Sequence, residues 1–182
     1  MKTTVLMMIV LCASAVFAQD DPSLPKGLED PAVATALAAC GPDKAKFDVT
    51  LTPGGKPQSA PADQALVYMV ADAPPGCGFN CAITTKIGLD GSWVGANHGP
   101  SYFSFAVAPG EHHLCARWQS RFRNRMVALA HFNAEPGKTY YFRVRPIASE
   151  NFGGYLDLDS INNNQGRFLV ASYPLSTSRA KQ

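Results

Sequence analysis

The cysteines are the residues whose chemistry is easiest to interpret. Beyond an apolar N-terminal run that holds Cys12, the chain contains four of them: Cys40, Cys77, Cys81 and Cys115. An even number in a chain that leaves the cytoplasm predicts two disulfides, although four cysteines allow three pairings. Only Gly-Phe-Asn separates Cys77 from Cys81, so these two can bridge within one turn, which would leave Cys40 to pair with Cys115. The Cys-x-x-x-Cys spacing is not that of a thioredoxin-like site, so structural disulfides are favoured over a redox or metal pair.

Two histidines, His112 and His131, are candidate metal ligands if their strands are neighbours, since cross-strand imidazoles can share an ion. His98, in the preceding loop, would add a third ligand. However, no His-x-x-x-His motif or carboxylate completes a zinc site, and such histidines often hydrogen-bond to the backbone instead. We therefore expect no metal and no cofactor, with metal handling as an alternative. His113 is expected on the opposite face.

Arginines gather near one expected hairpin. The cluster, with Phe122 interleaved, contains Arg117, Arg121, Arg123 and Arg125, and Arg143 and Arg145 are expected beside it. Such a patch suits an anionic partner such as an acidic glycan, a phospholipid head group or a protein. The alternative is an ordinary soluble hairpin tip.

Aromatic residues and known catalytic motifs give weaker signals. Trp93, Trp118 and Tyr102 can stack on sugars if exposed, but aromatic residues at alternating positions of a sandwich usually belong to the core. There is no Gly-x-Ser-x-Gly, no His-Glu-x-x-His and no pair of carboxylates spaced for acid–base chemistry. We therefore predict no catalytic residues and a protein that is not an enzyme, with the ligand-binding residues unknown.

The N-terminus has the pattern of a secretory signal peptide. Lys2 precedes an almost wholly apolar run from Val5 to Val16, and Val16-Phe17-Ala18 forms a cleavage pattern before Gln19. These features predict cleavage after Ala18 and a secreted or periplasmic protein. The apolar run is shorter than the ~20 residues that span a bilayer, so we expect no membrane-spanning segment.

Composition favours strands over long helices. Of the 182 residues, 46% are hydrophobic and only 16% charged, with 15 glycines and 14 prolines. Short strands joined by many turns fit these values, and the length fits one compact domain. A net charge of +2 argues against a strongly basic nucleic-acid-binding protein.

The chain divides into four parts. Residues 1–18 form the signal peptide, residues 19–61 a leader with a short helix over Ala32–Ala39, residues 62–174 the β-domain, and residues 175–182 a flexible tail. Within the leader, Phe47–Leu51 is a candidate strand.

Short alternating runs fill the β-domain. The candidate strands are Ala65–Ala71, Cys81–Leu89, Trp93–Ala96, Tyr102–Val107, Glu111–Trp118, Arg125–Ala134 and Thr139–Arg145. With turn pairs such as Asp90-Gly91 between them, they predict an antiparallel β-sandwich of the immunoglobulin or transthyretin type. Asp159-Ser160 would cap a short helix through Gln165, and Arg167–Tyr173 reads as helix or strand.

A register follows if the last three strands form consecutive hairpins. Ala134 then faces Thr139, and His112 faces His131. The predicted core face carries Leu114, Ala116, Val127, Leu129, Phe142 and Val144. The opposite face carries Cys115, Arg117, Met126, Phe132, Tyr141, Arg143 and Arg145, and a slip of one residue would reverse these assignments.

Several segments within Ala65–Tyr173 resemble a bacterial exported family, number 2846 in the domain-of-unknown-function series. The similar elements are Ile87–Gly95 with its Asp-Gly pair, Gly99–Val107, Pro109-Gly110-Glu111-His112-His113-Leu114 and Ala134–Val144. The resemblance implies a β-sandwich of the cell envelope and no known activity. Many members look like lipoproteins, whereas Cys12 follows Leu11 in a context unsuited to lipidation.

Together these features predict an exported, non-enzymatic β-sandwich with a binding or structural role in the cell envelope. The expected partner is an unknown envelope component, either a protein or an anionic glycan, and not nucleic acid. The alternative is a periplasmic metal-handling or glycan-binding module.

Overall fold

The computed structural model describes residues 31–54, 57–73, 82–120, 126–149 and 153–181. The expected signal peptide, Cys77, Cys81 and the arginines at 121, 123 and 125 lie outside these residues. Within them, the predicted N-terminal helix is present as α1 (Pro31–Leu37).

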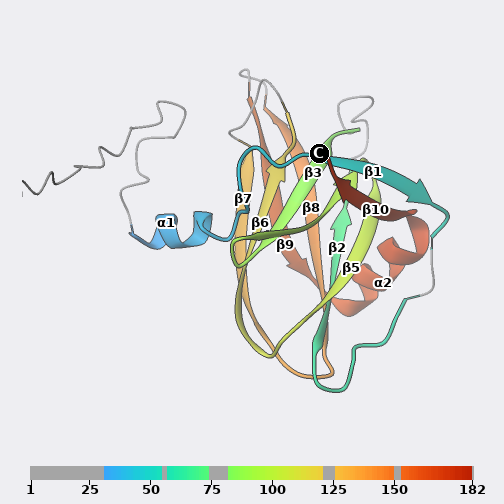
Figure 1. Ribbon diagram of the computed structural model, residues 1–182. Helices are drawn as coiled ribbons and strands as arrows, with labels where there is room; N and C mark the ends of the chain where they lie inside the picture. The colour runs from blue at the N-terminus through green and yellow to red at the C-terminus, as the bar shows by residue number, and fades with distance from the viewer. Residues whose placement is uncertain (1–30, 55–56, 74–81, 121–125, 150–152, 182) are drawn as a thin grey trace, which may run out of the picture.

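In the described part of the chain, ten strands form two sheets that pack face to face, as predicted for a β-sandwich (Figure 1). Sheet A has the order β1-β10-β5-β2-β8-β9 and sheet B the order β4-β3-β6-β7. Their bounds are β1 Phe47–Thr52, β2 Ala65–Ala71, β3 Thr84–Leu89, β4 Ser92–His98, β5 Ser101–Val107, β6 Gly110–Trp118, β7 Val127–Ala134, β8 Thr139–Ser149, β9 Gly153–Ile161 and β10 Leu175–Ala180. Most pairings are antiparallel, but β2 pairs with β8, and β10 with β5, in parallel.

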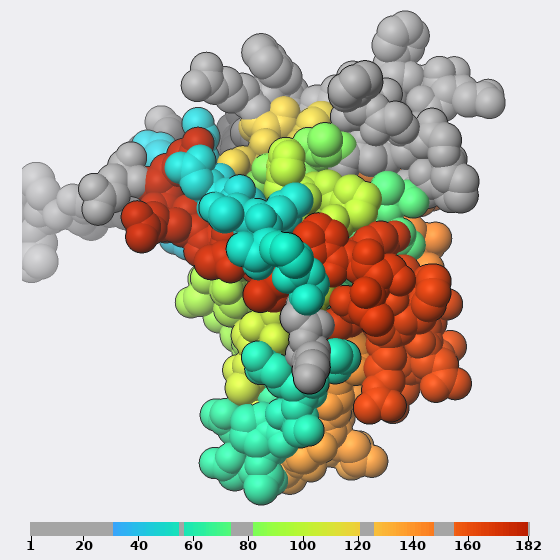
Figure 2. All heavy atoms as spheres, turned by 90° about the vertical axis from the view of Figure 1, so that its right-hand side faces the viewer, coloured from blue at the N-terminus to red at the C-terminus, as the bar shows by residue number. Residues whose placement is uncertain are grey.

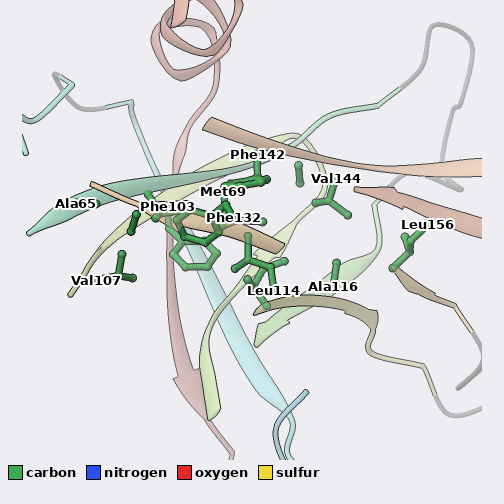
Figure 3. Close-up of a cluster of buried hydrophobic side chains, with 14 of the residues drawn as sticks. Ala65, Met69, Phe103, Val107, Leu114, Ala116, Phe132, Phe142, Val144 and Leu156 are labelled. Carbon is green, nitrogen blue, oxygen red and sulfur yellow. The ribbon is translucent and has the colours of Figure 1, made fainter. Parts of the chain in front are cut away.

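The main core lies between the two sheets (Figure 3). It contains Met69 from β2, Leu114 from β6, and Phe132 and Phe142, all buried. A second, smaller core lies on the outer face of sheet A, beneath the helix α2 (Asn163–Ser172). Alternating residues of β2 serve the two cores, since Val67 and Met69 face sheet B while Leu66, Tyr68 and Val70 face α2. That is why all seven residues of β2 are buried.

The prediction that β7 and β8 form a hairpin is wrong. Ala134 pairs with Gly110 rather than Thr139, because the chain crosses from sheet B to sheet A at Pro136-Gly137. Beyond this turn, β8 runs parallel to β2 instead of antiparallel to β7. A turn signal marks a reversal of the chain but does not say which sheet the next strand joins.

The register between β6 and β7 is also one residue away from the prediction. Leu114 faces Ala130, and His112 faces Phe132. Phe132 and Met126 therefore belong to the main core, contrary to prediction, whereas Val127 and Leu129 are half-buried on the outer face. The other predicted core residues, Leu114, Ala116, Phe142 and Val144, are indeed buried between the sheets.

The C-terminal region differs from the prediction in two places. Residues Asp159 and Ser160 lie in β9, and the helix begins later, where the Asn162 side chain accepts a hydrogen bond from the Gln165 N–H. The expected tail is the strand β10, which pairs with β1 along six residue pairs. The Ala96 N–H donates to Ser178 Oγ at 3.1 Å, and Ser176 Oγ donates to the Ala96 carbonyl at 3.0 Å. The two serines thus form hydrogen bonds with both backbone groups of Ala96 on the edge strand β4. Both β10 and β1 contact β4 and so close this side of the sandwich.

Candidate functional site

An N-terminal segment, residues 38–47, lies across the outer face of sheet B, and we call it the strap. It joins α1 to β1 (Figure 1). The predicted disulfide between Cys40 and Cys115 is present and attaches the strap to β6. Leu114 and Ala116 point into the core, so alternation along β6 turns Cys115 and Arg117 outward toward the strap.

Glycines let the strap approach the sheet closely. A Cβ atom on Gly88 would lie 2.6 Å from the Ala39 carbonyl oxygen, and one on Gly41 would meet the Trp93 ring. The Gly91 N–H donates to the same Ala39 oxygen at 3.1 Å. The sequence of β3 and its turn is therefore matched to a covering segment about 50 residues earlier in the chain.

Side chains of sheet B satisfy the backbone of the strap. Trp93 Nε1 donates to the Pro42 carbonyl at 2.9 Å. The Gln119 amide accepts from the Phe47 N–H at 2.6 Å and donates to the Phe47 carbonyl at 2.9 Å. Arg117 forms an ion pair with Asp43. Apart from the disulfide, polar contacts thus hold much of this segment.

Lys86 is the most unusual of these residues because its side chain is charged and only 3% of the residue is exposed. Its Nζ donates to the Ala45 carbonyl at 2.9 Å and to the Asp43 carbonyl at 3.4 Å. It also lies 4.1 Å from the centre of the Trp93 ring, a cation–π contact. Burial, followed by repulsion from Arg117, lowers the pKa of Lys86 to about 8, and attraction to Asp43 offsets only part of this.

A cavity of about 350 Å³ opens between the strap and the end of β6. We call it the basic pocket. It is lined by Asp43, Lys44, Ala45, Lys46, Lys86, Arg117, Trp118, Gln119 and Ser120. Four of these residues carry a positive charge and one a negative charge, and Asp43 is already paired with Arg117. The lining is therefore suited to an anionic group.

Of the predicted arginine cluster, the structure places Arg117 in the basic pocket. Arg143 and Arg145 do not lie beside it, which corrects the prediction. They belong to the outer face of sheet A, where Arg143 pairs with Asp159 at 2.9 Å and Arg145 with Asp157 at 2.7 Å. The reason is the crossing to sheet A before β8, which moves these arginines to the opposite side of the sandwich.

The predicted histidine pair is not formed. His112 Nδ1 lies 2.6 Å from Asp90 Oδ2, and its Nε2 lies 2.8 Å from the Ala108 carbonyl oxygen. Burial opposes the charged ring, but these hydrogen bonds and the Asp90 charge together raise the pKa of His112. His98 Nδ1 is 3.0 Å from Thr84 Oγ1. His131 faces His113 instead, so the three predicted ligands do not converge.

No group of three or more His, Cys, Asp or Glu side chains within the described residues is arranged to hold a metal ion. The three aromatic residues proposed for sugar stacking are also apart. Trp93 lies against the strap, Tyr102 is buried in the second core, and Trp118 packs at the edge of the main core and lines the basic pocket.

Sequence reasoning missed the role of Lys86 and of the lysines at 44 and 46. A lysine within a strand is usually solvent-facing, and no local pattern shows that a distant segment will cover it.

We found no match among protein-family models, curated proteins or solved structures. In the described part of the chain, no helix has the length and apolar character needed to cross a membrane.

Proposed function

We propose that this protein is an exported, non-enzymatic binding module of the cell envelope, and that its basic pocket holds an acidic glycan. The observation that carries the proposal is the concentration of positive charge around a cavity of about 350 Å³. Lys86 and Arg117 line it from neighbouring strands, where they are register partners. Lys44 and Lys46 are exposed on the strap.

The electrostatics of Lys86 favour an anion. Its lowered pKa reflects burial and a cationic neighbour, both of which penalise the ammonium form. A bound carboxylate would relieve that penalty and raise the pKa of Lys86. Binding is therefore coupled to proton uptake, and we expect affinity to fall as the pH rises above about 8.

Other lining residues favour a glycan over a simple ion. Trp118 is half-buried at the edge of the main core, and Gln119 is hydrogen-bonded to the Phe47 backbone; both line the pocket beside the cations. Aromatic stacking combined with polar groups is a common way to bind sugars, and the arginine and lysines would bind the acidic group. A protein carboxylate is the competing ligand.

The export proposal rests on the apolar N-terminal run, on the disulfide and on the resemblance to an exported family. The non-enzymatic part of the proposal takes into account that Asp43, the one carboxylate among the described residues lining the pocket, is paired with Arg117. General acid–base catalysis needs a group that is free to exchange a proton.

The test is retention on immobilised polygalacturonate, with neutral dextran as the reference matrix. We expect Lys44→Glu with Lys46→Glu to weaken binding at least about tenfold, since each exposed charge contributes up to about 1 kcal/mol and is reversed rather than removed. Lys138→Glu with Arg167→Glu is the matched control, because it changes net charge equally at exposed sites away from the pocket.

Equal loss in both double variants would show a net-charge effect and would refute the pocket. Unchanged retention in the strap variant would also refute it. If soluble polyglutamate competes as well as polygalacturonate, the ligand is a protein carboxylate and the glycan proposal is wrong.

A further inference from the structure

A second pair of histidines, which sequence analysis did not combine, lies on the outer face of sheet B. His113 of β6 and His131 of β7 are direct cross-strand partners. Their ring centres are 6.3 Å apart and their planes differ by 31°. His131 is exposed and His113 half-buried. This pair lies two residues from Cys115 along β6, on the same face as the strap.

The four histidines of the chain fall into two classes. Both ring nitrogens of His112 face oxygen acceptors, and Nδ1 of His98 faces a hydroxyl. In contrast, no group within the described residues makes a hydrogen bond to the ring nitrogens of His113 or His131. Among the described residues, His113 and His131 are thus the two histidines with neither ring nitrogen hydrogen-bonded, and their rings face one another.

The spacing of the rings suits a shared ion. An imidazole nitrogen binds Zn²⁺ or Cu²⁺ at roughly 2 Å, which places the ring centre roughly 3 Å from the ion. Two rings on one ion therefore have centres roughly 4.5–6.3 Å apart, depending on the angle at the metal. The observed 6.3 Å falls at the upper end, and a small side-chain rotation of exposed His131 shortens it.

We propose that His113 and His131 form a two-histidine site for a divalent transition-metal ion that prefers imidazole ligands. The two nitrogens act as a cross-strand chelate, and water completes the coordination. Among divalent first-row ions, Cu²⁺ binds nitrogen ligands most tightly. This site shares no residue with the basic pocket, so its test is independent of the proposed glycan ligand.

The test is titration of the mature protein with Cu²⁺, followed by calorimetry and electron paramagnetic resonance. We expect a single strong site with two coordinated imidazole nitrogens. His131→Gln and His113→Gln should each weaken binding at least about tenfold, since even loss of an indirect metal contact commonly costs that much. His98→Gln is the matched control and should leave both readouts unchanged.

His131 is exposed, so its replacement tests the site without disturbing packing. A spectrum that keeps the same nitrogen couplings in His131→Gln would place the copper elsewhere, for example on the N-terminal amine, and would overturn the proposal. Equal copper affinity of the wild type, His113→Gln and His131→Gln would also overturn the proposal.

Discussion

The two outer faces of the sandwich are covered in different ways. On sheet A the cover is α2, which packs an apolar surface onto β2 and β8, and it is visible with β10 in Figure 2. On sheet B the cover is the strap, an irregular segment held by one disulfide and by polar contacts with side chains of the sheet. The strap ends at β1, an edge strand of sheet A, whereas α2 lies between β9 and β10 of the sheet that it covers.

The apolar cover is closely packed. Leu169 and Val170 of α2 are buried against the aromatic rings of the second core, and Tyr68 stacks on Tyr141 with ring centres 5.1 Å apart. At its end, Tyr173 Oη donates to Asp72 at 2.5 Å, and burial together with that carboxylate raises the pKa of Tyr173 to about 12.

The polar cover is organised around charge. Lys86 is buried, but its ammonium needs acceptors, and the strap supplies backbone carbonyls. The strap is irregular and contacts the sheet at separate points, and the basic pocket lies beside it. The two covers therefore differ in what holds them: buried apolar side chains hold α2, whereas the disulfide, an ion pair and hydrogen bonds hold the strap.

Loss of the disulfide should destabilise the protein more than the other changes considered below. Cys40→Ser with Cys115→Ala should lower the free energy of unfolding by about 4 kcal/mol, because the bridge closes a loop with a sequence separation of 75 residues. Urea unfolding of the oxidised proteins measures this difference.

The same variant separates the two faces. Hydrogen exchange should accelerate first at the Gly91 N–H, which bonds to Ala39 of the strap, and at the Phe47 N–H, which bonds to the Gln119 side chain. The amides of α2 should exchange as slowly as in the wild type. If α2 loses protection as early as the strap does, the two covers are not independent and the comparison is wrong.

The next effect concerns the packing of α2. A Cβ atom on Gly166 would overlap the Tyr141 ring, at atoms next to the backbone that cannot move aside. We expect Gly166→Ala to destabilise the protein by about 2 kcal/mol, since overpacking outweighs the gain of about 1 kcal/mol in helix propensity. Thermal and urea unfolding measure this change.

Asn164→Ala is the control, because Asn164 is exposed in the first turn of the same helix. It should leave stability unchanged or raise it by a few tenths of a kcal/mol. A neutral Gly166→Ala would mean that α2 is held less closely than its apolar surface suggests, which would weaken the contrast with the strap.

The sequence predicted the parts of this fold that local alternation controls. Strand Ala65–Ala71 was placed at its observed bounds, since a run of apolar residues fits a strand buried on both faces. The Cys40–Cys115 bridge followed from the short spacing of the other two cysteines. The strand β10 was missed because its sequence, Leu-Ser-Thr-Ser-Arg-Ala, is polar and serves to close an edge rather than fill a core.

Long-range choices were not predictable in the same way. In β7, both alternating sets contain apolar residues, Val127 and Leu129 against Ala128, Ala130 and Phe132, so alternation alone cannot fix which set is buried. The basic pocket depends on the strap covering Lys86 from more than 40 residues away. Such a contact is determined by tertiary packing, which local patterns do not report.

The pH dependence of stability should differ between an ion pair of sheet B, which contains a titrating histidine, and the arginine pairs of sheet A. We expect this difference to be smaller than the two changes above. The pKa of His112 is raised above 6.5, so its contribution to stability is complete below that pH and is lost as the pH rises through the folded-state pKa. Burial opposes ionisation of Asp90, but bonds from the His113 N–H and His112 lower its pKa below 3.8. Its contribution is lost only as the pH falls through that lower value.

The His112–Asp90 pair should therefore stabilise the protein most between about pH 4 and 6.5. The Asp90 side chain is 43% exposed, and solvent screening limits the effect to less than about 1 kcal/mol. Urea unfolding at pH 5.5 and 8.5 should show a loss of stability in the wild type that His112→Asn reduces. Asp157→Asn removes the partner of Arg145, whose charge does not change in this range, and should cost the same at both values. If Asp157→Asn shows the same pH dependence as His112→Asn, the titrating group lies elsewhere and the two ion pairs do not differ in their response to pH.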